Sequence, residues 1–330
     1  MPSLLDVRLG QNPVVERLLY GYKTKGLIGQ ELFPTFPFSW DSGTVPIMSP
    51  ENMRVWDTAV ADGADVPVGE IRLSRAVINM TRHRFATPLT DGTLDQWMFP
   101  LPPEQMAAQN SMDIINRRYE LDCSVIACNA ASYAGGLSLN LVAAWANIAT
   151  PILTNVFTGM NAVENVIGES PNLFWCDKRT WRWIQQNTQV ATQAAIIRGA
   201  PGQVLEPVLV TQEAFASLIG VSKVVISGVR FGSDATPIVF GDPWGNGTGV
   251  ALASGCAGLA YIPTGGAIME PAFGYTFRAP GYPKAKMPYR IETKETTLYE
   301  VKDRRGPQIV PPTTGAVATG SGFLWIRTIV

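Results

Sequence analysis

Apolar and polar residues alternate along an extended stretch near the start of the chain, over Gly43–Asp91. The alternation covers 44–47 and returns over 71–74, which is the two-residue period of β-strands. Trp56 is the one Phe, Tyr or Trp over 51–84, so the long hairpin that this pattern predicts has few large apolar groups for a core of its own. We therefore expect neighbouring copies of the protein to cover it.

Charge is segregated along the same stretch. Residues 57–70 include four acids and no base, whereas residues 71–84 include four arginines, the one histidine and no acid. Opposite charges on adjoining segments can pair across strands and between subunits. We predict inter-subunit contacts through eight charged side chains of this loop: Asp57, Asp62, Asp65, Glu70, Arg72, Arg75, Arg82 and Arg84.

A helical pattern follows over Glu104–Tyr133. This segment has no Pro or Gly, and its apolar residues recur at spacings of three and four, which predicts one helix about 45 Å long. Asn116 and Glu120 fall on the opposite side, which we expect to face water. We predict a structural spine that packs on a sheet including the last strand of the chain, through an apolar stripe of Met112, Ile115, Tyr119, Ile126 and Tyr133.

From about Leu139 to Pro280, helices alternate with short apolar strands. Capping signals predict helices after Thr150, Asp177 and Thr211, with glycines at 168 and 220 ending the first and third. The strands predicted over 221–263 are too close together for crossover helices, which favours an α+β region with a mainly antiparallel sheet. An apolar strand closes the chain at 323–330, so the 139–280 region is predicted to be an insertion in a first domain.

Composition narrows the class of protein. The 330 residues are 46% hydrophobic and 16% charged, which is typical of a folded protein with much of its surface covered by association. Lys and Arg number 26 and Asp and Glu 27, so the net charge is −1. This balance argues against a dedicated nucleic-acid binder and leaves little repulsion between copies. We see no targeting signal or membrane-spanning run, and expect a cytoplasmic product.

Candidate catalytic and metal-binding residues are sparse. His83, the single histidine, lies between two arginines. We interpret it as one member of a basic stripe and not as a catalytic base. The four cysteines form no CxxC pair, so we expect buried free thiols and no zinc site. The glycine-rich run after Asp242 lacks the Gly-Lys-Ser/Thr end of a P-loop and predicts a hairpin turn. We expect no catalytic residue, cofactor or metal. The cluster of Lys178, Arg179, Arg182 and Arg198 could face packaged nucleic acid or the acids of a neighbour, but we favour the interpretation that its first three members form the solvated face of a helix.

The order of these parts resembles the major capsid protein of tailed bacteriophages, the Hong Kong 97-type fold. The stretches that carry the resemblance are spread over almost the whole chain: Glu31–Pro34 with the strand after it, Arg82–Asp91, Pro171–Trp181 and Gly322–Arg327. The resemblance implies an α+β fold with four parts. These are an N-terminal arm and first strand (1–42), an extended hairpin loop (43–91), a peripheral domain with the spine helix and its sheet (92–139 and 281–330), and an inserted axial domain (140–280).

The function that the resemblance implies is self-assembly into hexamers and pentamers of an icosahedral shell, which encloses double-stranded DNA without sequence-specific contacts. It implies a place in the virion, assembly in the host cytoplasm, no enzymatic activity and no membrane. The chain lacks the long charged, coiled-coil-like N-terminal region of the type member, so a separate scaffold, or none, is implied. A portal and a decoration protein stay open as partners. Two alternatives also stay open: a cellular nanocompartment shell of the same fold, and an α+β enzyme.

Overall fold

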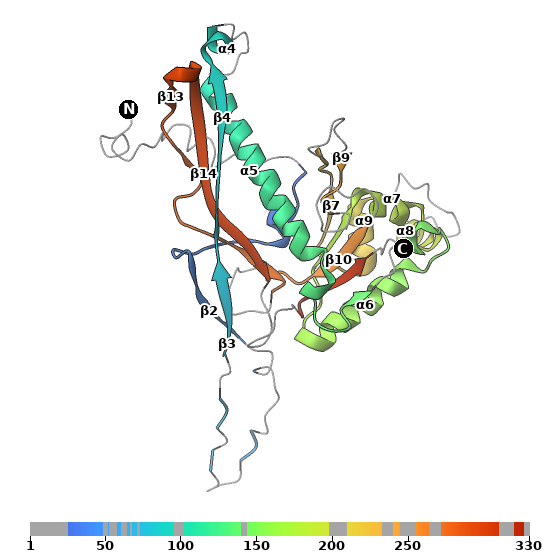
Figure 1. The fold of residues 1–330 in the computed structure, drawn as a ribbon. Coiled ribbons are helices and arrows are strands. Elements are labelled where there is room, and N and C mark those ends of the chain that lie inside the picture. Colours follow the sequence, from blue (N-terminus) through green and yellow to red (C-terminus); the bar gives the residue numbers. More distant parts are fainter. Residues whose placement is uncertain are drawn as a thin grey trace.

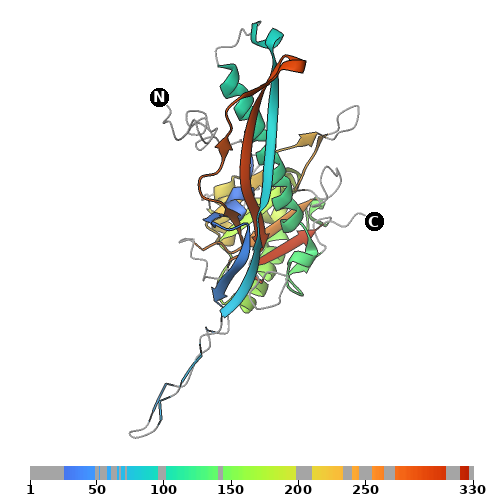
Figure 2. The same cartoon turned by 60° about the vertical axis from the view of Figure 1, so that its left-hand side comes forward.

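The computed structural model describes residues 26–48, 52, 58–60, 65–66, 68–70, 73–95, 102–139, 144–197, 210–232, 240–244, 255–263, 272–309 and 320–326. Figure 1 shows a tall, narrow part built on one long helix and long strands, beside a rounder part in which helices surround a second sheet. A two-stranded ribbon leaves the lower end of the tall part, as Figure 2 shows from another side. Residues 1–25, most of the predicted arm, lie outside the described residues.

The described strands of the tall part form a six-stranded sheet around β14. β4 pairs with one edge of β14, while β11, β12 and β13 pair at successive positions along the other edge, all antiparallel. β1 adds to β11 in parallel. The bounds are β1 Thr35–Pro37, β4 Thr81–Thr90, β11 Gly274–Arg278, β12 Lys284–Ala285, β13 Tyr289–Ile291 and β14 Thr296–Ile309.

The predicted hairpin differs from the ribbon that forms. The ribbon strands are β2, Ser42–Met48, and β3, Leu73–Asn79, which pair antiparallel in a two-stranded sheet. The chain after Met80 leaves the ribbon and joins the large sheet as β4, because β14 offers it ten consecutive partners. The predicted stretch of 43–91 therefore divides into a ribbon and a strand of the main sheet.

The long helix α5 runs over Pro103–Ala127 and packs on β4 and β14. It follows a short helix α4, Asp91–Asp95, and ends six residues before the predicted end at Tyr133. The chain turns there because Asn129 becomes extended and its side chain caps a 3-10 turn, η2, Ala130–Ser132. The prediction that α5 packs on the sheet of the last strand is wrong, since that strand belongs to the other sheet.

The second sheet has the strand order β5-β15-β10-β6-β7. It is mixed rather than mainly antiparallel: β10 runs antiparallel to β15 and β6, but β15–β5 and β6–β7 are parallel. The parallel β6–β7 pair exists because three helices lie between these strands in the chain, which is room for a crossover. The bounds are β5 Ser138–Leu139, β6 Leu173–Asp177, β7 Lys223–Ser227, β10 Cys256–Ala260 and β15 Gly322–Ile326.

The helices of the rounder part begin and end near the predicted signals. The Asp177 and Thr211 side chains accept backbone N–H groups at the starts of α7 and α9, and Gly168 and Gly220 end α6 and α9 with φ of 75° and 72°. These four caps are confirmed, whereas the cap predicted at Thr150 is wrong, because Pro151 is the residue that precedes α6. The bounds of the remaining elements are α3 Gly29–Leu32, η3 Ala144–Ala146, α6 Ile152–Ile167, α7 Lys178–Gln186, α8 Thr188–Ile197, α9 Gln212–Ile219, β8 Phe231–Gly232, β9 Phe240–Gly241 and η5 Glu292–Lys294.

One large core connects both parts of the molecule. It runs from Phe33 and Tyr119 at the tall part to Phe215 in the rounder part, and includes four fully buried tryptophans, Trp145, Trp175, Trp244 and Trp325. Gly258 lies so close to Trp175 that an added Cβ would meet its indole at 2.6 Å, so this position needs glycine. No helix in the described ranges is long and apolar enough to cross a membrane.

Candidate assembly surfaces

The ribbon is packed at its base and bare beyond it. Val45 and Ile78 are 7% and 0% exposed, and they form a small core with Tyr275 and Phe277 of β11. Phe38 adds a ring contact to Phe277, with centroids 5.9 Å apart. This core fixes the direction in which β2 and β3 leave the body.

Described residues of the connection between β2 and β3, together with one residue of β3, expose apolar side chains. Val66 and Val68 are 77% and 86% exposed, Val60 is 43% exposed, and Val77 on β3 is 65% exposed. Single exposed valines are normal on a protein surface, but three of these four lie in the connection between β2 and β3, of which no described residue is buried. A two-stranded ribbon is marginally stable in water at best, so this segment needs a surface to lie on.

The eight predicted contact residues fall into three groups. Asp65, Glu70, Arg75 and Arg84 are exposed. Arg82 is also exposed, but it binds a carboxylate of its own chain, Asp41, at 2.5 Å, and this guanidinium lowers the pKa of Asp41. The others, Asp57, Asp62 and Arg72, lie outside the described residues.

The predicted stripe of the long helix lies on the inner face of the large sheet. Met112 and Ile115 are buried with Ala285 and Val301. Tyr119 is also buried, and its hydroxyl is 2.5 Å from the Thr276 Oγ1 atom. Two members differ: Ile126 is half-buried, and Tyr133 follows the helix, where its hydroxyl donates to the Ala127 carbonyl at 2.7 Å.

A buried charge network joins the same helix to β14. Asp303, 1% exposed, accepts two hydrogen bonds from Arg278, at 3.0 and 3.1 Å, and forms an ion pair with Arg305 at 2.9 Å. The Arg305 guanidinium lies 4.1 Å from the centre of the Tyr119 ring and donates to the Asn116 Oδ1 atom at 2.7 Å. Burial lowers the pKa of Arg305, and Asp303 opposes that shift. Sequence alternation alone cannot show that these charges face inward.

Glu120 is a second inward-facing charge that the sequence analysis placed in water, wrongly. Its side chain is fully buried, and its two oxygens accept from the backbone N–H groups of Ile28 at 2.8 Å and Gly29 at 2.9 Å, and from the Trp244 indole at 2.8 Å. Burial raises the pKa of Glu120, and the three donors oppose that shift. The Glu120 side of α5 is shielded from water because the 26–33 segment and the loop after β9 cover it. Glu120 therefore ties three distant segments together.

Two further carboxylates lie near this point. Asp177 is buried at the start of α7, and burial raises its pKa although the N–H groups of Arg179 and Thr180 oppose that shift. The pKa of Asp242 is raised to about 7, chiefly by burial and secondly by the negative charge of Asp177. The Trp244 N–H opposes this shift. Among the described residues no group of His, Cys, Asp and Glu is arranged to hold a metal ion.

The remaining candidates have structural surroundings. His83 is half-buried on β4, which lowers its pKa through the loss of water. The four cysteines are buried and free, and burial raises the thiol pKa of Cys123, Cys128 and Cys176. Lys178, Arg179 and Arg182 form the exposed face of α7, as favoured above, while Arg198 lies outside the described residues.

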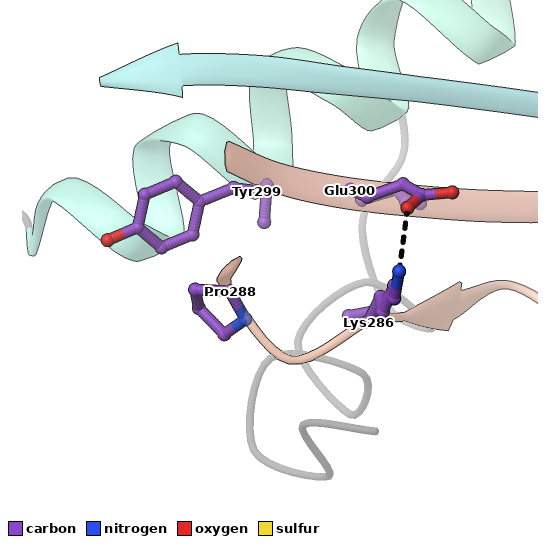
Figure 3. A pocket seen from close by; sticks show the side chains of 7 residues that line it. Lys286, Pro288, Tyr299 and Glu300 are labelled. Atoms are coloured by element: carbon purple, nitrogen blue, oxygen red, sulfur yellow. Dashed lines mark ion pairs between the residues drawn. The ribbon is translucent and has the colours of Figure 1, made fainter. Parts of the chain in front are cut away.

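A pocket at the edge of β14 is too small for a ligand. It is lined by seven residues, of which Figure 3 labels Lys286, Pro288, Tyr299 and Glu300. Its volume of about 10 Å³ is at the limit of what one water molecule requires, and far below the several hundred Å³ of small-molecule sites. Lys286 reaches across its mouth to Glu300 at 3.6 Å.

Comparisons with known proteins point to similarity with phage capsid proteins. No protein-family model matches the chain. The chain is 24% identical over 318 residues to the major capsid protein of Burkholderia phage BcepMu. This match covers 94% of this chain and 96% of that protein. A phage-related protein of Bordetella bronchiseptica has a similar crystal structure, with a TM-score of 0.69, 20% identity and coverage of 95% and 96% of the two chains.

Solved shells also share the fold. The capsid of cyanophage P-SCSP1u matches with a TM-score of 0.56, 13% identity and coverage of 94% and 90% of the two chains. A virus-like particle from Pyrococcus furiosus matches with a TM-score of 0.50 and 8% identity, covering 98% of each chain. In sequence the chain is similar to a phage major capsid protein, and its α+β fold is the Hong Kong 97-type fold of tailed-phage capsids.

Proposed function

We propose that this protein is the major capsid protein of a tailed bacteriophage, and that it assembles into hexamers and pentamers of an icosahedral shell around double-stranded DNA. The observation that carries the proposal is the ribbon. It extends from a well-packed base with its valines exposed, on a chain whose fold and sequence are similar to those of phage capsid proteins. The proposed role is structural and requires no active site.

In this proposal the ribbon lies on a neighbouring subunit. The connection between β2 and β3 comprises residues 49–72, and each half of it can reach up to about 40 Å at 3.3 Å per residue. Exposed ion pairs are worth only about 0–1 kcal/mol each, but a closed shell repeats every contact in every copy. The long helix α5 and the sheet of β14 act as the rigid peripheral part, and the part around the second sheet acts as the axial part.

The main alternative is a cellular compartment with the same fold. A TM-score of 0.50 to the Pyrococcus furiosus particle is compatible with it, but the sequence relative is a phage protein, which favours the capsid. Expression of the full chain followed by negative-stain microscopy separates the two. Closed shells are expected if the proposal holds, with DNA once the phage packaging machinery is present. Shells filled with host protein support the compartment, and small oligomers under all assembly conditions contradict both.

A further inference from the structure

A row of three cations crosses the outer face of the large sheet. Lys302 on β14 lies directly opposite Lys284 on β12 and Arg84 on β4. Directly opposite residues share one face of a sheet. Val301 and Ala285, the neighbours of the two lysines in sequence, are buried with residues of α5, so the row points to the face away from that helix.

This row is partly compensated inside its own subunit, since the Lys284 ammonium lies 5.1 Å from the centre of the Tyr282 ring. Adjacent strands are about 4.8 Å apart, so three positive charges lie within about 10 Å, and like charges placed directly opposite each other destabilise a sheet. Among the described residues the one carboxylate that an ion pair connects to the row is Glu300, 3.6 Å from Lys302, and it also binds Lys286. Arg84 is exposed. The free subunit therefore presents cations that an anionic partner would stabilise.

The positive strip continues toward the base of the ribbon. Arg82 and Arg304 lie directly opposite each other, two residues from the row, and share the Asp41 carboxylate. Trp40, next to Asp41 in the chain, is 72% exposed. The residue that precedes the shared carboxylate is thus a large exposed apolar side chain of a type enriched at protein interfaces.

We propose that the row of Arg84, Lys302 and Lys284 binds the acidic connection between β2 and β3 of a second copy of this chain, through Asp65 and Glu70. The inference rests on the proposed self-assembly and identifies the receiving surface. Both carboxylates are exposed, and no base occurs over 57–70 to neutralise them. The exposed valines between them supply apolar surface for Trp40, so charge and apolar groups are matched on the two sides.

The partner is another copy because the ribbon leads away from the row in its own chain. In Figure 1, β2 and β3 point down from the body, whereas β4 and β14 run up from the same level. The ribbon of one subunit and the row of the next are different surfaces, so the contact is heterologous, and it forms rings where the rotation between subunits closes. Duplex DNA is the competing ligand. Every copy of the chain carries both the row and the acidic residues of 57–70, so the two are present in equal number in any assembly, which is not true of DNA.

Charge reversal on each side, and on both, tests the contact. Arg84→Glu with Lys302→Glu reverses the row, and Asp65→Lys with Glu70→Lys reverses the ribbon. We expect each double variant to lower the assembled fraction at least tenfold in sedimentation velocity, and the quadruple variant to regain most of the wild-type fraction. This readout scores association even if closed shells never form, so it separates this contact from the proposed shell function.

Two controls keep the outcomes interpretable. Lys178→Glu with Arg182→Glu makes the same charge change on the exposed face of α7 and should assemble as the wild type does. Arg84→Gln with Lys302→Gln removes the charges without opposing Glu300, and should weaken assembly while the melting temperature of the unassembled subunit does not fall. Normal assembly of the row variant, or a quadruple variant no better than either double, overturns the proposal. Shells that form normally but lose packaged DNA assign the row to phosphate instead.

Discussion

Replacing Glu120 by Gln tests whether one buried carboxylate holds three segments of the chain together. Gln keeps the volume, and its Oε1 atom can still accept from Ile28 and Trp244. Its NH₂ group then faces the N–H of Gly29, where the carboxylate accepted at 2.9 Å. One buried donor without an acceptor costs about 1–3 kcal/mol, and the smaller desolvation cost of a neutral side chain offsets part of that. We expect the free energy of unfolding to fall by about 1–2 kcal/mol.

Glu120→Ala should cost more, about 3 kcal/mol or above, because all three N–H groups lose their acceptor in a dry site. The assay is urea unfolding followed by tryptophan fluorescence, on subunits held below the concentration at which they assemble. Glu169→Gln is the matched control, since the same chemical change at an exposed position should alter stability by no more than about 0.5 kcal/mol. If Glu120→Gln and Glu169→Gln unfold alike, Glu120 does not tie the segments together.

Three further outcomes follow from the packing and the charges. The folded pKa of Asp242 is about 7 against an ordinary 3.8, so its contribution is complete below about pH 4 and is lost as the pH rises through 7. Asp242→Asn should therefore flatten the fall in melting temperature between pH 5 and 8, and an unchanged slope counts against this. Ile115→Asp buries an unpaired carboxylate under β14 and should cost several kcal/mol, so a normal yield of folded subunit would contradict the packing of α5. The four buried cysteines should resist a thiol reagent until the protein unfolds, and fast modification of the native protein would show that this core opens.

Local signals in the sequence located most elements of the rounder part. The helix caps act through contacts within a few residues of themselves, and such contacts can be predicted from one sequence. They are Asp177, Thr211, Gly168 and Gly220. The ribbon strands were legible for the same reason, since their alternation is local.

Long-range pairings were the part that the sequence could not decide. The last strand, β15, was expected beside the long helix, but it completes the sheet of β10, and nothing in its five apolar residues distinguishes the two sheets. Glu120 and Arg305 were not recognised as buried because a charged residue on a helix or strand usually faces water. The partners of Glu120, and those that Arg305 binds on the long helix, come from segments 90 or more residues away in the chain. The row of Arg84, Lys302 and Lys284 depends on strand register in the same way.

The most direct test of the central claim is a cryo-EM reconstruction of the particles that the full chain forms. The account predicts a closed icosahedral shell of hexamers and pentamers, in which the connection between β2 and β3 of each subunit lies across the large sheet of its neighbour. A protein that remains in small open oligomers, or a shell in which each ribbon folds back on its own subunit, would contradict it.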